Sequence, residues 1–336
     1  RHATDFLRKH EFPCPVFCPD IGSFFTLDTY RRFQVIRKYI REQAIDIVQT
    51  VFNDSALSHP FFTVGSGVKV VSSRRDMGFW YTPAKLVILR LNTLFTHGYL
   101  VNSHAVEKNL RKSEWVPARK IVVIPNGHDL SRFDGLPRAG FHSRYGIPED
   151  APIIGIVANL RPVKRVHDLM AAFALVLKEQ TDAFLVIVGH TGEMLDEYTA
   201  LAADLGIDSH VRFLGLIDDP IPVMKHFAVG VNCSESEGLS NTIIEYMGCG
   251  VPVVATDTQG NRELVVHEET GLVTPVGDTR GLAASILRLL REPSLRGRLV
   301  SSAREYVMKC FDERSVVRQH ERFYIDLVGA ARADQR

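Results

Sequence analysis

Short runs of apolar, mostly β-branched residues recur along the whole chain, and stretches with helical periodicity separate them. Because almost every position in these runs is apolar, the strands that they form must be buried on both faces. Alternation of such strands with helices is typical of parallel α/β sheets with right-handed crossovers. The predicted strands are Ile45–Phe52, Val68–Ser72, Tyr99–Asn102, Lys120–Ile124, Pro152–Ala158, Ala183–Val188, Val211–Leu214, Val229–Cys233 and Val251–Ala255. The predicted helices are Tyr30–Ala44, Pro83–Phe95, Val166–Lys178, Met194–Leu205, Ile243–Met247 and Leu282–Leu290.

The rhythm of strands and helices is interrupted once, at Phe133–Ala151, where Gly, Pro and charged residues gather. The balance of charge changes at the same place. The first 150 residues hold 21 Lys and Arg against 14 Asp and Glu, and the remainder holds 19 against 25. We therefore expect two domains, 1–140 and 141–312, each built on a parallel sheet. Ligands of such sheets bind beyond the carboxyl ends of the strands, so facing domains would enclose a cleft.

Several classes of protein are disfavoured by what the sequence lacks. It has no apolar run of the roughly 20 residues that a membrane span needs. Five cysteines in 336 residues make no disulfide framework, which favours reduced thiols and a cytoplasmic location. No aromatic–basic stripe or nucleic-acid-binding module is present, so nucleic acid is not an expected partner.

Common motifs for phosphate and metal chemistry are also missing. There is no Gly-Lys pair for a Walker loop, no GxGxxG, no HExxH and no Asp-x-Asp. The 13 histidines are scattered without the spacing of metal ligands. We therefore predict neither a metal site nor a cofactor.

The densest signal lies between Asn232 and Glu269, where a strand ends and small residues lead into an apolar helix. The turn Gly238-Leu239-Ser240-Asn241 would present free backbone N–H groups at the positive end of the helix dipole, which is an anion site. Glu237 precedes this helix and Glu245 lies eight residues further on, about 12 Å along a helix axis. The two carboxylates would then contact different parts of an extended ligand. The alternative is a capped core helix with two solvated glutamates.

This segment resembles the signature of the retaining glycosyltransferases of family 4, group 1, which have the GT-B fold of two Rossmann-like domains. The resemblance rests on Glu237 and Glu245 at their spacing, followed by Gly250–Thr256. Further segments that match the family, in chain order, are Val101–Ser103, Ile124–Gly127 with Arg132 and Phe133, Val157–Lys164, Val188–Gly189 and Phe213–Gly215.

The resemblance implies a metal-independent transfer of a hexose from a nucleoside-diphosphate sugar to a saccharide or lipid-linked acceptor, in glycan or polysaccharide synthesis. It implies that Glu245 binds the ribose hydroxyls and that Glu237 contacts the donor hexose. The backbone at Gly238, Leu239, Ser240 and Asn241 would hold the sugar hydroxyls and the distal phosphate. Gly189 and Leu214 would complete the nucleotide-sugar site.

Lys164 matches the family lysine that neutralises the diphosphate. Where many members have an arginine before the leucine of this loop, the chain has Asn159, so we expect Arg161 to supply the second cation. A solvent-facing Arg161 is the alternative. A fixed cation and a helix N-terminus stabilise a departing diphosphate more in the transition state than in the ground state.

The acceptor is expected on the first domain, at polar groups that follow its strands. These groups are Asn53, Asp54, Arg75 and Asp76. Many relatives carry a histidine in this region, and the chain has none at the two matching places. Residues 1–20 lack glycine and are interpreted as a later helix and strand, so the first strands of this domain are expected to be missing.

Two further segments carry expectations. Residues 313–336 should form a helix that crosses back to the first domain, as in the family. The helix Tyr30–Ala44 carries five basic residues, which fit either a solvated face or contact with an anionic membrane at its inner face. Two other functions remain open: a sugar-nucleotide epimerase of similar fold, and a protein that only binds the nucleotide sugar.

Overall fold

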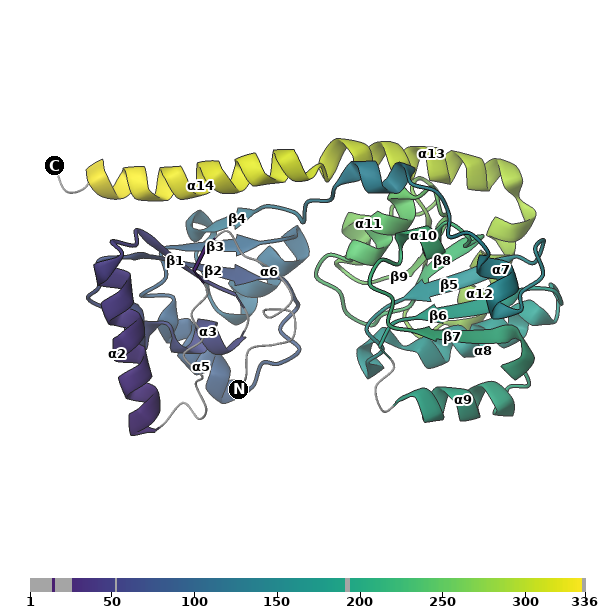
Figure 1. Ribbon diagram of the computed structural model, residues 1–336, viewed down its shortest axis with the longest axis horizontal. Helices are drawn as coiled ribbons and strands as arrows, with labels where there is room; N and C mark the ends of the chain where they lie inside the picture. Colours follow the sequence, from purple (N-terminus) through teal and green to yellow (C-terminus); the bar gives the residue numbers. More distant parts are fainter. Residues whose placement is uncertain (1–13, 16–25, 52, 191–193, 334–336) are drawn as a thin grey trace.

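The computed structural model describes residues 14–15, 26–51, 53–190 and 194–333, and they form two parallel-sheet domains (Figure 1). Most of residues 1–20, including the helix and strand expected there, lie outside the described residues, as does Phe52. The prediction of a two-domain α/β fold is confirmed.

Within the described residues, the first domain has a four-stranded sheet in the order β1-β2-β3-β4. All of its strand pairs are parallel. Its strands are β1 (Ile47–Thr50), β2 (Lys69–Arg74), β3 (Gly98–Val101) and β4 (Ile121–Val123). Its helical elements are α2 (Leu27–Glu42), α3 (Asn53–Ser58), α4 (Pro60–Thr63), α5 (Pro83–Asn92), α6 (His104–Ser113) and η1 (Ala118–Lys120).

The second domain is a six-stranded parallel sheet in the order β10-β9-β8-β5-β6-β7. Its strands are β5 (Ile153–Val157), β6 (Phe184–Val188), β7 (Val211–Gly215), β8 (Val229–Asn232), β9 (Val253–Thr256) and β10 (Leu272–Thr274). The order reverses between β5 and β8, which is the point where open α/β sheets bind their ligands.

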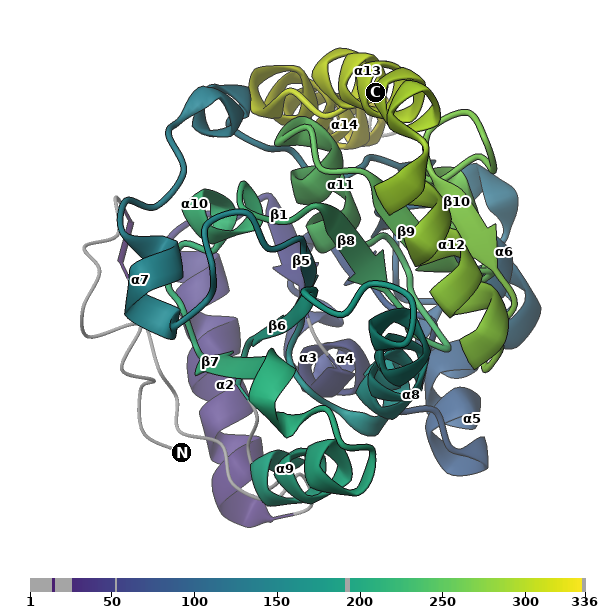
Figure 2. The ribbon, with the colours of Figure 1, turned by 90° about the vertical axis from the view of Figure 1, so that its right-hand side faces the viewer.

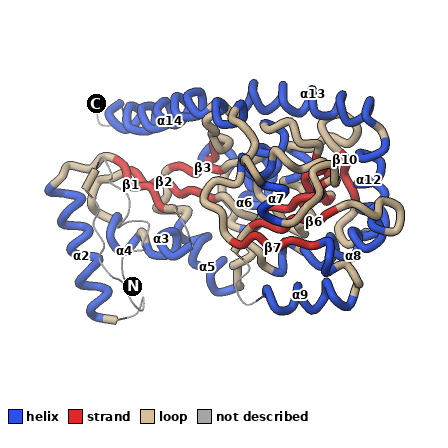
Figure 3. Tube along the Cα trace, turned by 45° about the vertical axis from the view of Figure 1, so that its right-hand side comes forward, coloured by secondary structure: helices blue, strands red, loops and turns tan. Residues whose placement is uncertain are grey.

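Helices cover both faces of the second sheet (Figure 3), which explains why its strands are apolar throughout. Ile154 of β5 faces the core beneath α8 and α12, whereas its neighbour Ile153 faces the core beneath α7, α10 and α11. The helical elements are η2 (Leu130–Asp134), α7 (Phe141–Tyr145), η3 (Pro162–Lys164), α8 (Val166–Leu177), α9 (Leu195–Asp204), η5 (Asp208–His210), α10 (Ile221–Met224), α11 (Asn241–Gly248), η6 (Asn261–Glu263), α12 (Thr279–Arg291) and α13 (Pro293–Cys310).

The last helix, α14 (Glu313–Ala333), runs from the second domain along the first sheet (Figure 1). Its Phe323 ring lies so close to Gly98 that a Cβ there would come within 2.8 Å of it. Val316 shares a core cluster with Val71 and Leu100. None of the helices in the described ranges combines the length and the apolar character that crossing a bilayer requires.

Candidate functional site

The loops that follow β5 and β8 meet at the switch point of the second sheet. The Cys233 thiol, just beyond β8, donates to the carbonyl of Lys164 at 3.0 Å and so fixes the loop that follows β5. Burial raises the pKa of this thiol to about 12, which keeps it protonated as a donor. In the same way, Glu235 N donates to Val163 O at 3.0 Å. The lysine loop and the glutamate loop are therefore one unit.

Lys164 and Glu237 form an ion pair within this unit, with 2.6 Å between Nζ and Oε1. Their side chains are 23% and 12% exposed, so water screens the pair only in part. The Ser234 hydroxyl donates to the same carboxylate oxygen at 2.7 Å. The ammonium group and the carboxylate thus stand next to each other at the carboxyl edge of the sheet.

A buried network of amide and hydroxyl side chains contacts Glu237. Asn232 Nδ2 lies 3.3 Å from Glu237 Oε1 and 3.0 Å from Ser240 Oγ. Ser240 is the N-cap of α11, where its Oγ accepts from Ile243 N. Asn261 holds Asn232 in turn, with 3.3 Å between Nδ2 and Oδ1. This network links the position of Glu237 to the first turn of α11.

The pair opens into a cavity of about 240 Å³ that both domains line. From the first domain come Arg75, Asp76, Met77 and Phe79, and from the second come Asn159, Arg161, Val163, Lys164, Ser236, Glu237, Gly238 and Leu239. The domains meet closely at Gly238, where a Cβ would come within 2.6 Å of the carbonyl oxygen of Arg75. The cavity therefore brings together the predicted residues Arg161, Lys164 and Glu237 with Arg75 and Asp76.

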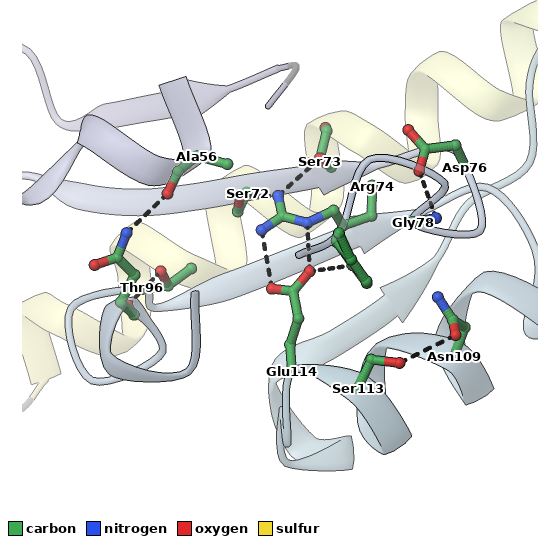
Figure 4. Close-up of polar contacts among 12 residues, drawn as sticks. Ala56, Ser72, Ser73, Arg74, Asp76, Gly78, Thr96, Asn109, Ser113 and Glu114 are labelled. Carbon is green, nitrogen blue, oxygen red and sulfur yellow. Dashed lines mark hydrogen bonds and ion pairs between the residues drawn. The ribbon is translucent and has the colours of Figure 1, made fainter. Parts of the chain in front are cut away.

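The buried Glu114 carboxylate contacts both ends of the loop that carries Arg75 and Asp76 (Figure 4). At the start of the loop, Arg74 Nε and Nη2 donate to the two oxygens of Glu114 at 2.9 and 3.0 Å. At its end, the Tyr81 hydroxyl donates to the same carboxylate. Within the loop, Asp76 Oδ1 accepts from Gly78 N at 2.7 Å and from Trp80 Nε1 at 3.1 Å. Asp76 therefore shapes this loop as well as lining the cavity.

Glu245 projects from α11 on the side of the η2 segment. Burial raises the pKa of its carboxyl to about 7, Asp219 acts in the same direction and Arg132 opposes them. Arg132 itself pairs with Asp219, with 2.9 Å between Nη2 and Oδ1. Asn241, at the start of the same helix, accepts a hydrogen bond from Asn126 Nδ2 at 2.7 Å.

The other predicted residues lie outside the walls of this cavity. Gly189 follows β6 and lies against the loop that follows β5, since a Cβ on it would be 1.7 Å from Ala158 O. Its φ of 139° is one that favours glycine. Leu214 is half-buried against the core beneath α7, α10 and α11. Asn53 and Asp54 begin α3, where the carbonyl of Asp54 accepts from Ser58 Oγ at 2.7 Å.

Sequence reasoning missed the groups that support the site. Asn232 ends β8 and Ser234 follows it, but the partners of both side chains depend on tertiary packing. Glu114 lies 40 residues from Arg74, and no local pattern pairs them. Across the part of the chain with described coordinates, no group of three or more His, Cys, Asp or Glu could hold a metal ion.

Two family patterns match the chain. Residues 138–306 match "Glycosyl transferases group 1", and residues 4–132 match "Glycosyltransferase Family 4". The chain belongs to glycosyltransferase family 4, group 1. The predicted family is therefore confirmed, and residues of both matched regions line the cavity.

Curated relatives of this chain carry different names. N-acetyl-alpha-D-glucosaminyl L-malate synthase of Bacillus anthracis is 30% identical over 70% of this chain and 59% of its own. A phosphatidyl-myo-inositol mannosyltransferase of Mycolicibacterium smegmatis is 32% identical over 62% and 53%. The chain spans between about half and three fifths of the length of these two relatives.

Solved structures share the fold of this chain. Anabaena HepE in complex with UDP and glucose has a TM-score of 0.84 at 22% identity, over 96% of this chain and 88% of that chain. A sucrose-phosphate synthase from Thermosynechococcus elongatus has a TM-score of 0.80 at 24% identity, over 92% and 81%. At these identities the likeness establishes the GT-B fold alone.

Proposed function

We propose that this chain transfers a hexosyl group, with retention and without a metal ion, from a nucleoside-diphosphate sugar to a saccharide or lipid-linked acceptor. The observation that carries the proposal is the Lys164–Glu237 pair at the switch point, in one cavity with Arg75 and Asp76 of the other domain. A cation beside the first turn of α11 suits a diphosphate, and the facing domain offers polar groups to a second substrate.

In this proposal the Lys164 ammonium group leaves Glu237 and pairs with the donor diphosphate when the donor binds. Arg161 adds a second positive charge. Glu237 is then free to accept hydrogen bonds from the hexose, while Glu245 holds the ribose. The bond between the anomeric carbon and the diphosphate oxygen breaks, and the nucleoside diphosphate departs with the electron pair. The acceptor hydroxyl bonds to the same face of that carbon, and its proton passes to a phosphate oxygen of the leaving group.

The acceptor would lie against the first domain, next to Arg75 and Asp76. Asn53 and Asp54, at the start of α3, would serve only an acceptor that extends beyond the cavity. Support for a saccharide or lipid-linked acceptor comes from the relatives, whose names include a phosphatidyl-myo-inositol mannosyltransferase and a lipopolysaccharide core glycosyltransferase.

The test begins with a thermal-shift screen of UDP-, GDP- and ADP-sugars, because a ligand that binds the native state raises the melting temperature.

With the donor found, Lys164→Ala should lower kcat/KM for transfer by about 100- to 1,000-fold, since it removes one group that stabilises the leaving charge. Arg161→Ala should lower it less, and the exposed Lys309→Ala serves as the matched control. A chelator should leave the rate unchanged.

Each contrary result points to a different function. Intact transfer by both the Lys164 and Arg161 variants would refute the leaving-group account. Epimerised donor without an acceptor would favour the epimerase. Nucleotide-sugar binding with neither hydrolysis nor transfer would favour a protein that only binds.

A further inference from the structure

Helix α5 and the turn after it expose several large apolar side chains. Leu91 is 57% exposed and Leu94 is 75% exposed. We call this surface the α5 stripe, and it consists of Val87, Ile88, Leu91, Leu94 and Phe95. Positions 87, 91 and 94 have the spacing of one helix face. In Figure 2, α5 projects at the outer edge of the molecule, beyond α8.

Basic side chains adjoin the α5 stripe at its C-terminal half. Arg90 Nε donates to Ser113 O at 2.9 Å, which ties α5 to the end of α6. Lys120 Nζ donates to the carbonyls of Thr93 and Thr96 at 2.8 and 2.7 Å, which ties the turn after α5 to η1. We call five of the cations on these joined elements the basic rim: Arg90, Lys108, Arg111, Lys112 and Arg119.

An exposed tryptophan packs against the basic rim. Trp115 is 66% exposed, and the Arg90 guanidinium lies 3.8 Å from the centroid of its ring. Its φ of 59° lies in the left-handed region, which bulky residues rarely adopt. Its ring also borders a hollow of about 610 Å³ lined by Lys108, Arg111 and Lys112.

Few carboxylates oppose this positive charge. Residues 77–106, which include α5, contain no Asp or Glu. Glu107 of α6 lies 3.9 Å from Arg111, and Glu114 is buried with Arg74. The other basic helix, α2, is more neutralised, because Arg32 pairs with Asp28 at 2.7 Å and Lys38 with Glu42 at 3.5 Å.

We propose that the α5 stripe, Trp115 and the basic rim dock this chain on an anionic lipid bilayer. An apolar helix face bordered by Lys and Arg, with a Trp at the boundary, is the combination that binds at a membrane interface. The loop Arg75–Trp80, which lines the cavity, runs directly into α5, so docking would bring the acceptor side toward the lipid. Only this last consequence rests on the proposed function.

Flotation of the full chain with vesicles tests the proposal. The chain should float with phosphatidylcholine vesicles that contain phosphatidylglycerol, and high salt or pure phosphatidylcholine should release it. Each basic residue at an anionic surface strengthens binding about fivefold, so the double variant Arg111→Glu, Lys112→Glu should weaken binding at least about tenfold. Leu91→Glu, Leu94→Glu should also abolish flotation.

Three control variants should float like the unchanged chain. Leu216→Glu places the same charge at an exposed leucine of the second domain. Arg31→Glu, Arg41→Glu reverses two charges on α2. Lys164→Ala removes the proposed catalytic cation, and because no donor or acceptor is present, flotation is independent of whether transfer occurs. Leu91→Ser, Leu94→Ser replaces the glutamate variant if thermal melting shows that it is unfolded.

The proposal is overturned if the unchanged chain fails to float with the anionic vesicles. It is also overturned if the α5 variants float normally, or if only the α2 variant is released. A dimer in sedimentation that the α5 variants convert to monomers, without flotation, would assign the stripe to a second copy of the chain instead.

Discussion

At the scale of single residues, Glu245 is subject to two opposing demands. In the role that we propose, Glu245 accepts hydrogen bonds from ribose hydroxyls most strongly as an ionised carboxylate, yet burial raises the pKa of this carboxyl from 4.5 to about 7. The folded state therefore holds the proton to a higher pH than the unfolded state does. Stability falls as the pH rises from about 4.5 to about 7, because the unfolded chain ionises first, and it levels off above that.

Glu245→Gln should therefore stabilise the chain while weakening the proposed nucleotide binding. At pH 8 the variant should melt at a higher temperature than the unchanged chain, and the difference should shrink toward pH 5. Nucleotide affinity should fall at least about tenfold, since hydrogen bonds to a charged group are lost. Melting curves across this pH range, with and without nucleotide, give both readings. An equal melting temperature at pH 8 would contradict the raised pKa.

The sequence analysis chose Lys164 and Glu237 singly and did not expect the ion pair that joins them. Their loops were placed correctly because both follow strands that are apolar throughout, and parallel strands end at one edge. The contact between them depends on the Cys233 hydrogen bond and on the curvature of two loops 73 residues apart. Asn53 and Asp54 were chosen by the same rule about strand ends, and the structure places them in α3, away from the cavity walls.

At the scale of elements, the loop between β2 and α5 depends on one carboxylate. Glu114→Gln would leave the buried Arg74 guanidinium without its counter-charge, which costs about 3–5 kcal/mol of unfolding free energy. Tyr81→Phe removes one hydrogen bond and keeps the ion pair, so it should cost about 1 kcal/mol. Denaturant unfolding of both variants measures the difference. Equal losses would show that the ion pair does not hold the loop.

The contact between the loops after β5 and β6 also depends on a single residue, Gly189. Gly189→Ala would place a Cβ 1.7 Å from Ala158 O, so one of the two loops must move. Gly206→Ala is the matched control, because its φ is also positive, at 67°, and a Cβ there meets nothing within 4 Å. The control should lose about 1 kcal/mol and the Gly189 variant several times more. Similar melting temperatures for the two would refute the close approach.

The interior strands of the second sheet were predictable because they are apolar throughout, whereas two helices and a short edge strand were missed. The expected helix Val166–Lys178 corresponds to α8, and Leu282–Leu290 is the central part of α12. Helices α6 and α13 were not predicted, since both are short of apolar residues and bury only one narrow face. Strand β10, with three residues at the edge of the sheet, was also missed.

At the scale of the whole molecule, a carboxylate joins the two domains. Glu263 of the second domain accepts from His104 N at 2.9 Å and from Ala105 N, at the positive end of α6. Glu263→Ala should therefore let the domains separate, and small-angle scattering should report a larger radius of gyration. The exposed Glu269→Ala is the control. An unchanged radius would show that other contacts keep the domains together.

The chain crosses between the domains twice, and the two crossings are bonded to each other. His128 N donates to Phe311 O at 2.8 Å, and Glu313 N donates to His128 O at 3.0 Å. A Cβ at Gly127 would come within 2.8 Å of the Glu313 Cα. Both connections thus form a single pivot along one side of the molecule (Figure 1). Rotation about it would widen the opposite side most, so the cavity between the domains would open without sliding one sheet past the other.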